Sequence, residues 1–283
     1  MSPLALVTGA SSGIGKAFAE RLAADGYDLI IVGRRRERLD ALAASLTSPA
    51  LTSPSLTSPA LTDVAVQVVV ADLATDAGID AVADLCATQP LTMLVNNAGV
   101  AHYMPMADLP AATARELLSV KVIAPTLLTR AALRGMLERG SGTILNVAGM
   151  IAFSGPAAPA APQGQRAVYA GTLAHTVALT QTLHAELEGT GVNVHVVCPG
   201  IVATEFHEVQ GMDLSALPRM SAADVVTAAL AGIELGEVVS APGVEDYSLL
   251  EAVFDADLAA FHGQSPALAS RYAANQSETP VHS

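Results

Sequence analysis

The stretch Leu4-Ala-Leu-Val-Thr8-Gly-Ala-Ser-Ser-Gly13-Ile-Gly15 leads from an apolar run through a glycine-rich loop into a segment with helical spacing. Glycines allow a tight turn and let the backbone N–H groups at a helix N-terminus approach a pyrophosphate. A glycine-rich loop alone is a weak signal. Between a predicted strand and a predicted helix, however, it is typical of the first unit of a doubly wound sheet, so it predicts dinucleotide binding.

The rest of the chain repeats this alternation of apolar runs and amphipathic segments. The predicted strands cover residues 4–7, 29–32, 64–70, 93–95, 143–147 and 192–197, with a short run near Val238. The predicted helices cover about residues 13–25, 35–46, 75–87, 108–138, 167–188 and 222–235. Apolar strands separated by helices favour a parallel sheet covered on both faces. We therefore expect a single α/β domain, a Rossmann-like doubly wound parallel sheet in three α/β/α layers.

Composition excludes several classes of protein. The chain has 283 residues, of which 51% are hydrophobic and 14% charged, so it is not disordered. Its 14 basic and 27 acidic residues give a net charge of −13, which disfavours binding to nucleic acid or to an anionic membrane. The apolar runs are too short to span a bilayer, and the N-terminus does not resemble a signal peptide. The two cysteines, Cys86 and Cys198, lack metal-ligand spacing, so we expect a cytoplasmic protein without a metal site.

Two further motifs follow the glycine-rich loop in order and register. Asn96-Asn-Ala-Gly99 comes after the fourth predicted strand, and Pro199-Gly200 comes after the sixth. With these three motifs the chain resembles the short-chain dehydrogenase/reductase family over about residues 4–243. The resemblance implies an NAD(P) cofactor, a hydride-transfer fold, a small-molecule substrate and a homodimer or homotetramer. The apolar residues of helix 167–188 are also explained by burial against the protein's own core.

The domain organisation follows from the same comparison. Residues 1–245 are expected to form the Rossmann-like NAD(P)-binding and catalytic domain, and residues 246–283 a C-terminal helical extension with a polar tail. Within the domain, a low-complexity insert at 46–62 contains three copies of a five-residue unit, which is Leu-Thr-Ser-Pro followed by Ala or Ser. Proline is incompatible with helix and with strand pairing, so we expect an extended surface linker there.

The loop and the resemblance together assign a cofactor site. Asp72 and Leu73 are expected to flank the adenine, while Asn96 lies along its ribose. Thr204 is expected to reach the nicotinamide carboxamide. Asp72 could equally be a turn residue and Thr204 a helix cap. The full set of expected cofactor-binding residues is Thr8, Gly9, Ser11, Ser12, Gly13, Ile14, Gly15, Arg34, Arg35, Asp72, Leu73, Asn96, Ala98, Gly99, Tyr169, Pro199, Gly200, Ile201 and Thr204.

The end of the second predicted strand indicates which dinucleotide binds. An NAD-specific protein of this kind places an acidic side chain there to hold the ribose diol, but this chain reads Gly33-Arg-Arg-Arg36. Arg34 and Arg35 can form charge-assisted bonds with a 2′-phosphate. We therefore expect NADP(H) rather than NAD(H), against the alternative of a solvated basic helix start.

The catalytic tetrad of the family is degenerate in this chain. Active members use a tyrosine as proton donor, a lysine one helical turn later, a serine that holds the substrate oxygen and an asparagine on the preceding helix. The tyrosine is present as Tyr169, but Leu173 stands at the lysine position and Gly149 at the serine position. Lys121 stands at the asparagine position. The chain is therefore identified as an atypical member.

A redox function requires compensation for these losses. We hypothesise that Lys121 places its ammonium near Tyr169 and the nicotinamide ribose, against the alternative that it is solvated or pairs with Glu116. His102, Tyr103 and Ser154 are the candidates to replace the serine hydroxyl, and Thr172 is a further possibility. A surface location is the alternative for His102.

The function that best fits these features is an NADPH-dependent oxidoreductase of the carbonyl reductase or alcohol dehydrogenase type. Phe206 and Met212, after the Pro199-Gly200 motif, indicate a small, fairly apolar substrate, although core packing also explains them. The catalytic residues would be Tyr169, Lys121, His102 and Ser154. The alternatives are a non-redox cyclase, lyase or isomerase on the same scaffold, or a catalytically inactive cofactor-binding protein.

Overall fold

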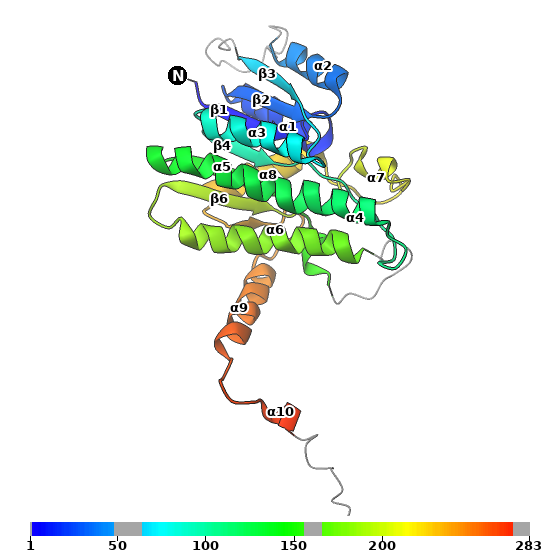
Figure 1. Ribbon diagram of the computed structural model, residues 1–283, viewed down its shortest axis with the longest axis vertical. Helices are drawn as coiled ribbons and strands as arrows, with labels where there is room; N and C mark the ends of the chain where they lie inside the picture. Colours follow the sequence, from blue (N-terminus) through cyan, green and yellow to red (C-terminus); the bar gives the residue numbers. More distant parts are fainter. Residues whose placement is uncertain (1, 48–63, 156–165, 274–283) are drawn as a thin grey trace, which may run out of the picture. The chain divides into compact units, whose positions relative to one another are not determined.

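The computed structural model describes residues 2–47, 64–155 and 166–273, and seven strands within these residues form one parallel sheet (Figure 1). The spatial order is β3-β2-β1-β4-β5-β6-β7, and every neighbouring pair is parallel. The strands are β1 (Leu4–Thr8), β2 (Asp28–Gly33), β3 (Val66–Val70), β4 (Met93–Asn96), β5 (Gly142–Val147), β6 (Val192–Val197) and β7 (Val239–Ser240). This is the predicted Rossmann-like doubly wound sheet.

The strand order creates the place where a ligand can bind. The chain moves outward from β1 to β3 and then returns to lay β4 on the other side of β1. The loops that follow β1 and β4 therefore turn to opposite faces and leave a crevice at the carboxyl ends of these two strands. The glycine-rich loop and the Asn96-Asn-Ala-Gly99 motif both begin at this edge.

Helices cover both faces of the sheet, as the three-layer prediction requires. The helices α3, α5 and α6 lie over one face, and α1 and α8 pack together over the other (Figure 1). Their bounds are α1 (Gly13–Ala24), α2 (Arg36–Leu46), α3 (Asp76–Thr88), α4 (Ala111–Leu118), α5 (Ala124–Arg139), α6 (Ala167–Glu186), α7 (Phe206–Val209) and α8 (Ala222–Glu234). A short 3₁₀ helix, η3 (Met150–Phe153), follows β5.

The single helix predicted over 108–138 is in fact interrupted. A π-helical turn, η2 (Ser119–Ile123), joins α4 to α5. Pro125 stands at the start of α5, has no N–H to donate to the carbonyl of Lys121 four residues earlier, and would clash with it in a regular α-helix. The wider turn relieves this conflict. It places Lys121 in the irregular part of the helix.

Val244–Ser283 form a compact unit separate from Met1–Gly243. The helical pattern predicted near residues 247–272 is two helices, α9 (Ser248–His262) and α10 (Ser270–Ala273). Leu250 is buried, whereas Leu249, Leu258 and Phe261 are exposed. The tail at 274–283, residues 48–62 of the predicted insert and residues 156–164 of the segment before Tyr169 lie outside the described residues.

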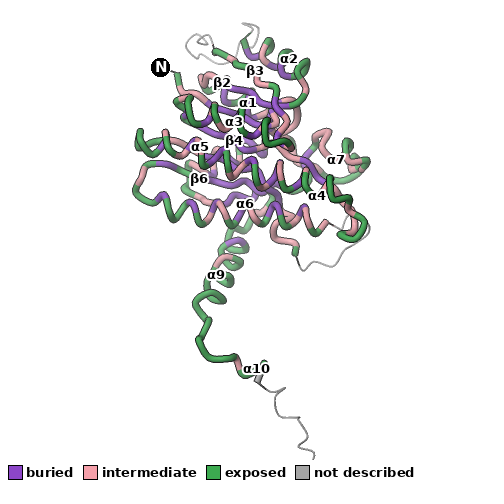
Figure 2. Tube along the Cα trace, in the orientation of Figure 1, coloured by how far each residue is buried: buried purple, intermediate pink, exposed green. Residues whose placement is uncertain are grey.

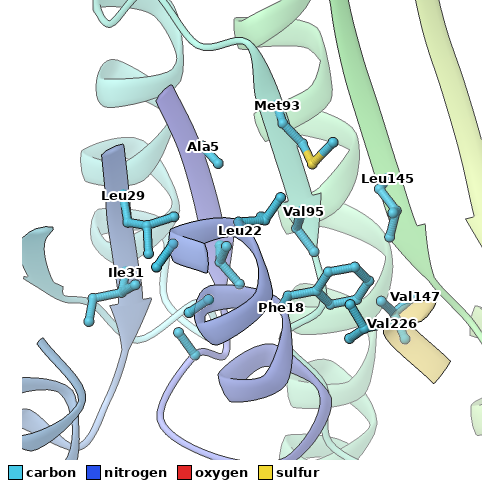
Figure 3. Close-up of a cluster of buried hydrophobic side chains, with 14 of the residues drawn as sticks. Ala5, Phe18, Leu22, Leu29, Ile31, Met93, Val95, Leu145, Val147 and Val226 are labelled. Atoms are coloured by element: carbon cyan, nitrogen blue, oxygen red, sulfur yellow. The ribbon is translucent and has the colours of Figure 1, made fainter. Parts of the chain in front are cut away.

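The core lies between the sheet and its helices, and the strands are its most buried part (Figure 2). On the face covered by α1, Phe18 and Leu22 point from that helix toward Val95 (Figure 3). Leu145, Val147 and Val226 complete this cluster around Phe18. On α6, Leu173, Val177 and Leu183 are also buried within the chain. Their apolar character is thus explained without an interface between subunits.

No helix in the described ranges is both long enough and apolar enough to cross a membrane.

Replacing Phe18 tests this core. Phe18 is 0% exposed, so we expect Phe18→Ala to lower the free energy of unfolding by about 3–5 kcal/mol in urea denaturation followed by circular dichroism. Phe261, on α9, is 65% exposed, and Phe261→Ala should change it by less than about 0.5 kcal/mol. Equal effects of the two variants would contradict the packing described.

Candidate functional site

The hydroxyl of Thr8 joins the loops that follow β1 and β4. Its Oγ1 accepts hydrogen bonds from the backbone N–H groups of Asn97, at 2.9 Å, and Ala98, at 3.0 Å. It also donates to the carbonyl of Val95, at 3.2 Å. In return, Asn97 Nδ2 donates to the carbonyl of Thr8, at 2.9 Å. These bonds hold the two loops side by side at the crevice.

Three glycines make this close approach possible. Gly9 and Gly13 have φ values of +68° and +55°, in the region that favours glycine. A side chain on Gly15 would collide with Asn97 Nδ2 and with the carbonyl of Gly9. The glycine-rich loop therefore keeps its backbone open toward the crevice, as a pyrophosphate requires.

A cavity of about 840 Å³ opens at this edge of the sheet. The predicted site residues that line it are Gly9, Ser11, Ser12, Gly13, Ile14, Arg34, Arg35, Asp72, Leu73, Ala98, Gly99, His102, Lys121, Ser154, Tyr169, Pro199, Gly200, Ile201 and Thr204. Thr8, Gly15 and Asn96 do not line it. Thr8 and Gly15 lie on the side of the loops away from the cavity, so they affect the cavity through the backbone conformation of these loops.

Asn96 has a different place from the one predicted along the adenosine ribose. Its side chain is buried, and Nδ2 donates to Thr129 Oγ1 at 3.1 Å and to Asn146 Oδ1 at 3.0 Å. Asn146 in turn donates to Thr180 Oγ1 at 2.9 Å. Asn97, rather than Asn96, lines the large cavity. The strand register explains the difference, because Asn96 is the last residue of β4 and pairs with Asn146 of β5.

Arg35 faces the glycine-rich loop. Its guanidinium donates to Ser11 Oγ, at 2.9 and 3.2 Å, and to Ser12 Oγ, at 2.8 Å. The remaining nitrogen, Nη1, forms an ion pair with Glu205 Oε1 at 2.6 Å, and Arg38 Nη1 binds the other oxygen of Glu205 at 2.6 Å. Burial alone would raise the pKa of Glu205, but the hydrogen bonds from Arg38, Arg35 and Ser12 lower it to about 2.

Arg34 faces away from this cluster. Its Nη1 lies 3.6 Å from Glu116 Oε1, and the other oxygen of Glu116 lies 3.2 Å from His102 Nε2. Glu116 therefore pairs with Arg34 and His102, and the predicted alternative of a pair with Lys121 is wrong. His102 lines the cavity, and its side chain is 27% exposed.

Tyr169 is 6% exposed and contacts a second tyrosine. The rings of Tyr103 and Tyr169 meet edge to face, with centroids 5.5 Å apart, and their hydroxyls share a hydrogen bond. Burial raises the pKa of Tyr169 above its ordinary value, and the Tyr103 hydroxyl raises it further. Tyr103, one of the three candidates for the missing serine hydroxyl, is thus the one that contacts Tyr169.

Lys121 is 7% exposed and lines the same cavity. Its Nζ approaches Gly99 so closely that a side chain there would collide with it. Within residues 2–47, 64–155 and 166–273 the ammonium has no ion-pair partner. Burial lowers the pKa of Lys121 from 10.5 to about 8. A buried cation without a counterion is unfavourable, which distinguishes Lys121 from ordinary surface lysines.

The positions of the missing serine and lysine are adjacent. A Cβ on Gly149 would lie 3.5 Å from the Leu173 side chain, so the cavity wall is apolar at this point. Ser154 lies farther along this wall, where its hydroxyl donates to the carbonyl of Ile151, at 2.8 Å, and accepts from Arg166 Nη2, at 2.9 Å. Both hydrogen-bonding roles of Ser154 are therefore used within the protein.

Asp72 makes the turn contact offered as its alternative, whereas Thr204 makes a local contact but is not the N-cap of α7, which is Glu205. Asp72 Oδ1 accepts from the backbone N–H of Ala74 at 3.0 Å, as a turn residue does. Thr204 Oγ1 accepts from the backbone N–H of Phe206 at 3.3 Å, just before α7. Both residues nevertheless line the cavity.

Sequence reasoning missed Glu205 altogether. Glu205 directly follows Thr204, but its partners Arg35 and Arg38 are about 170 residues away in the chain, so no local spacing reveals the cluster. The available signal was that the acidic Glu205 follows Thr204, an expected cofactor contact, in a chain that has arginines directly after its second strand.

Comparisons with known proteins cover the residues that build this cavity. A model of the short chain dehydrogenase family matches residues 3–214. An uncharacterized oxidoreductase of Staphylococcus epidermidis is 32% identical over 229 residues, which make up 80% of this chain and 88% of the relative.

Solved structures resemble the chain over most of its length. A short-chain dehydrogenase from Sphingobium yanoikuyae in complex with NADPH is 31% identical, with a TM-score of 0.83 over 95% of this chain and 99% of that one. The bulky-bulky ketone specific alcohol dehydrogenase from Comamonas testosteroni is 27% identical, with a TM-score of 0.80 over 95% and 98% of the two chains.

The glycine-rich loop can be tested without any ligand. We expect Gly15→Ala to lower the free energy of unfolding by about 2 kcal/mol, because the added methyl group must displace Asn97 or the loop backbone. Gly171, in α6, has open space where a Cβ would stand, and Gly171→Ala should raise it by about 0.5–1 kcal/mol. Thermal or urea unfolding of both variants checks this. A stable Gly15→Ala protein would show that the loops are not in close contact.

Proposed function

The chain belongs to the short-chain dehydrogenase family, and from this premise we propose that it is an NADP(H)-dependent oxidoreductase of the carbonyl reductase or alcohol dehydrogenase type. One observation carries the proposal. The glycine-rich loop, Arg35 and Tyr169 line a single cavity at the carboxyl ends of the strands. A phosphate-binding loop and a proton donor thus open into the same space.

The residues of the cavity fit a dinucleotide with a 2′-phosphate. The open backbone of the loop from Gly9 to Gly15 suits the pyrophosphate, and the absence of a side chain on Gly15 lets the loop pack against Asn97 behind it. Arg35, with Ser11 and Ser12, presents guanidinium and hydroxyl donors suited to a phosphate monoester. The Sphingobium yanoikuyae relative, solved in complex with NADPH, supports the same choice.

Tyr169 suits the role of proton donor. Bound NADPH would supply the hydride for the carbonyl carbon, and the substrate oxygen would then need a proton to become a hydroxyl. Tyr169 carries its proton at neutral pH and can donate it to that oxygen, but burial raises its pKa and makes it a weaker acid, so the donation requires a nearby cation. Tyr103 packs edge to face on Tyr169 and so helps to hold its ring in place.

Lys121 is proposed to supply the cation that Leu173 cannot. A pKa of about 8 leaves Lys121 mostly protonated at neutral pH, and the ammonium lies against Gly99 on the cavity wall. From there it can donate hydrogen bonds to the ribose beside the nicotinamide and favour negative charge on the reacting oxygen. A buried, unpaired ammonium is retained at a cost in stability, which is typical of functional sites.

The substrate half of the cavity is mainly apolar. The apolar side chains that line it are Val100, Met150, Ile151, Phe206, Val209, Met212, Leu214 and Leu217. This lining supports a small, fairly apolar carbonyl compound or alcohol as the substrate. The ketone specificity stated for the Comamonas testosteroni relative is consistent with that class.

We further propose a cytoplasmic homodimer or homotetramer. Leu118, Ile123 and Leu127 remain exposed along α4, η2 and α5, where a second copy could cover them. Both cysteines are free and buried, as is usual for a protein of a reducing compartment.

A non-redox enzyme such as a cyclase, lyase or isomerase is the second candidate. The apolar contact between Gly149 and Leu173 favours it, because the hydroxyl and the ammonium of the family's usual hydride-transfer site are replaced there. Such an enzyme would use Tyr169 as an acid without consuming the cofactor.

Cofactor consumption separates the two candidates. We expect the protein to oxidise NADPH, followed at 340 nm, in the presence of a panel of apolar ketones and aldehydes. Tyr169→Phe should lower turnover by about 100-fold or more, since the proton donor is lost while the ring packing remains. Binding of NADPH without oxidation by any carbonyl compound, together with Tyr169-dependent conversion of another substrate, would favour the non-redox candidate.

Lys121→Met should affect stability and turnover in opposite directions. Burial of the charge lowers the pKa of Lys121 from 10.5 to about 8, and this shift measures what the buried charge costs the folded protein. Removing the charge should therefore raise the free energy of unfolding at pH 7 by about 2–3 kcal/mol. The folded protein binds fewer protons than the unfolded chain between these two values, so wild-type stability rises with pH there and the advantage of Lys121→Met disappears near pH 10.5. Turnover should fall about tenfold or more.

Lys16→Met is the matched control for this variant. Lys16 lies on α1, its side chain is 51% exposed, and it forms an ion pair with Glu20 on its own helix. The Lys16→Met variant should keep the turnover of the wild-type enzyme and the pH dependence of that turnover. A Lys121→Met enzyme with wild-type turnover would refute the role proposed for Lys121.

A further inference from the structure

Glu205 occupies a set of donors that would suit a phosphate. Two guanidinium groups hold its carboxylate, Arg35 on Oε1 and Arg38 on Oε2, each at 2.6 Å. Ser12 also donates to it. Guanidinium and hydroxyl donors are those that bind phosphate monoesters most strongly in proteins. The carboxylate stays ionised throughout the neutral range, because these same bonds lower its pKa to about 2.

The cluster lies at the cofactor end of the cavity. Ser11, Ser12, Arg35 and Glu205 all line it. Arg35 follows the end of β2 and is the N-cap residue of α2. In a doubly wound sheet, the adenosine ribose lies at the end of the second strand, which is this position. An anion bound by Arg35 and Ser12 would therefore compete with the carboxylate of Glu205 for the same hydrogen bonds.

Glu205 also belongs to the segment that forms the substrate half of the cavity. It precedes α7 directly, and Phe206, His207 and Val209 of α7 all line the cavity. On its other side, the methyl group of Thr204 would contact a side chain placed on Gly13. The Arg35–Glu205 ion pair thus ties the substrate-side segment to the glycine-rich loop.

We propose that Glu205 is an internal substitute for the cofactor's 2′-phosphate and determines cofactor selectivity. Glu205 holds Arg35 and Arg38 in place, and a nucleotide with a 2′-phosphate displaces it. A nucleotide without that phosphate leaves the ion pairs intact. Displacement frees the start of α7, so the substrate-side segment responds to the phosphate. The proposal rests on the NADP(H) site proposed above, but not on hydride transfer.

The test uses two nucleotides that differ only in the phosphate. Adenosine 2′,5′-bisphosphate carries the 2′-phosphate and adenosine 5′-monophosphate lacks it, and calorimetry measures their dissociation constants. We expect Glu205→Gln to tighten binding of the bisphosphate about fivefold or more, because a competing anion is removed from the arginines. Binding of the monophosphate should change by less than about twofold. NADPH and NADH should differ in the same way.

Glu208→Gln is the matched control, since it removes the same charge from the same segment. Glu208 lies on α7 but does not line the cavity. We expect it to leave both dissociation constants unchanged, which excludes a general effect of net charge. Unfolding in urea should show that both variants are folded. A second readout is hydrogen exchange of residues 204–217, which should rise when the wild-type protein binds the bisphosphate and should not rise with the monophosphate.

Several results would overturn the proposal. If Glu205→Gln weakened only the monophosphate and NADH, Glu205 would be the acceptor for the 2′-hydroxyl. Equal weakening of all four nucleotides would show instead that Glu205 closes over the bound cofactor. Unchanged affinities would show that the ion pairs are incidental. If the wild-type protein and Glu205→Gln bound none of the four, the NADP(H) site would fail as well. Tight binding without carbonyl reduction would refute only the redox function.

Discussion

The hydrogen bonds of the Thr8 hydroxyl are the constraint on which the site depends. A doubly wound sheet brings the ends of β1 and β4 together, but the loops that follow these strands leave toward opposite faces. The sheet alone therefore does not fix the two loops relative to each other. Thr8 Oγ1 accepts from two successive N–H groups of the β4 loop and so fixes Ala98 and Gly99 beside the glycine-rich loop. Gly99 in turn bounds the space in which the Lys121 ammonium lies. One hydroxyl therefore links the glycine-rich loop to the part of the cavity wall where Lys121 lies.

Lys121 shows how the fold supports a group that is unfavourable by itself. Pro125 forces the π-helical turn, and the turn places Lys121 on the cavity wall and not along a regular helix face. The apolar Leu173 and Gly149 stand where other members of the family carry their lysine and serine. Lys121 and Tyr169 line the same cavity, but they come from different elements, η2 and α6.

The sequence predicted what depends on local pattern, and its failures have physical causes. Short apolar runs gave the strands, because strands buried on both faces need no polar alternation. The glycine-rich loop could be placed because its conformation follows from its glycines. The π-turn was visible only as Pro125 within a helical pattern. Side-chain directions were not predictable in the loops, and there Tyr103 contacts Tyr169 whereas His102 pairs with Glu116. Glu205 was missed because its partners are distant in sequence.

The carboxylate of Glu205 also determines how the empty protein attracts its ligand from solution. The chain carries a net charge of −13, and Arg34 and Arg35, directly after β2, are among the basic residues that line the cavity. Glu205 and Glu116 neutralise most of their charge through ion pairs. Long-range steering of an anionic nucleotide toward the crevice is therefore weak. The net negative charge of the chain opposes the approach of any anionic ligand, so salt, which screens this repulsion, should favour association at the crevice.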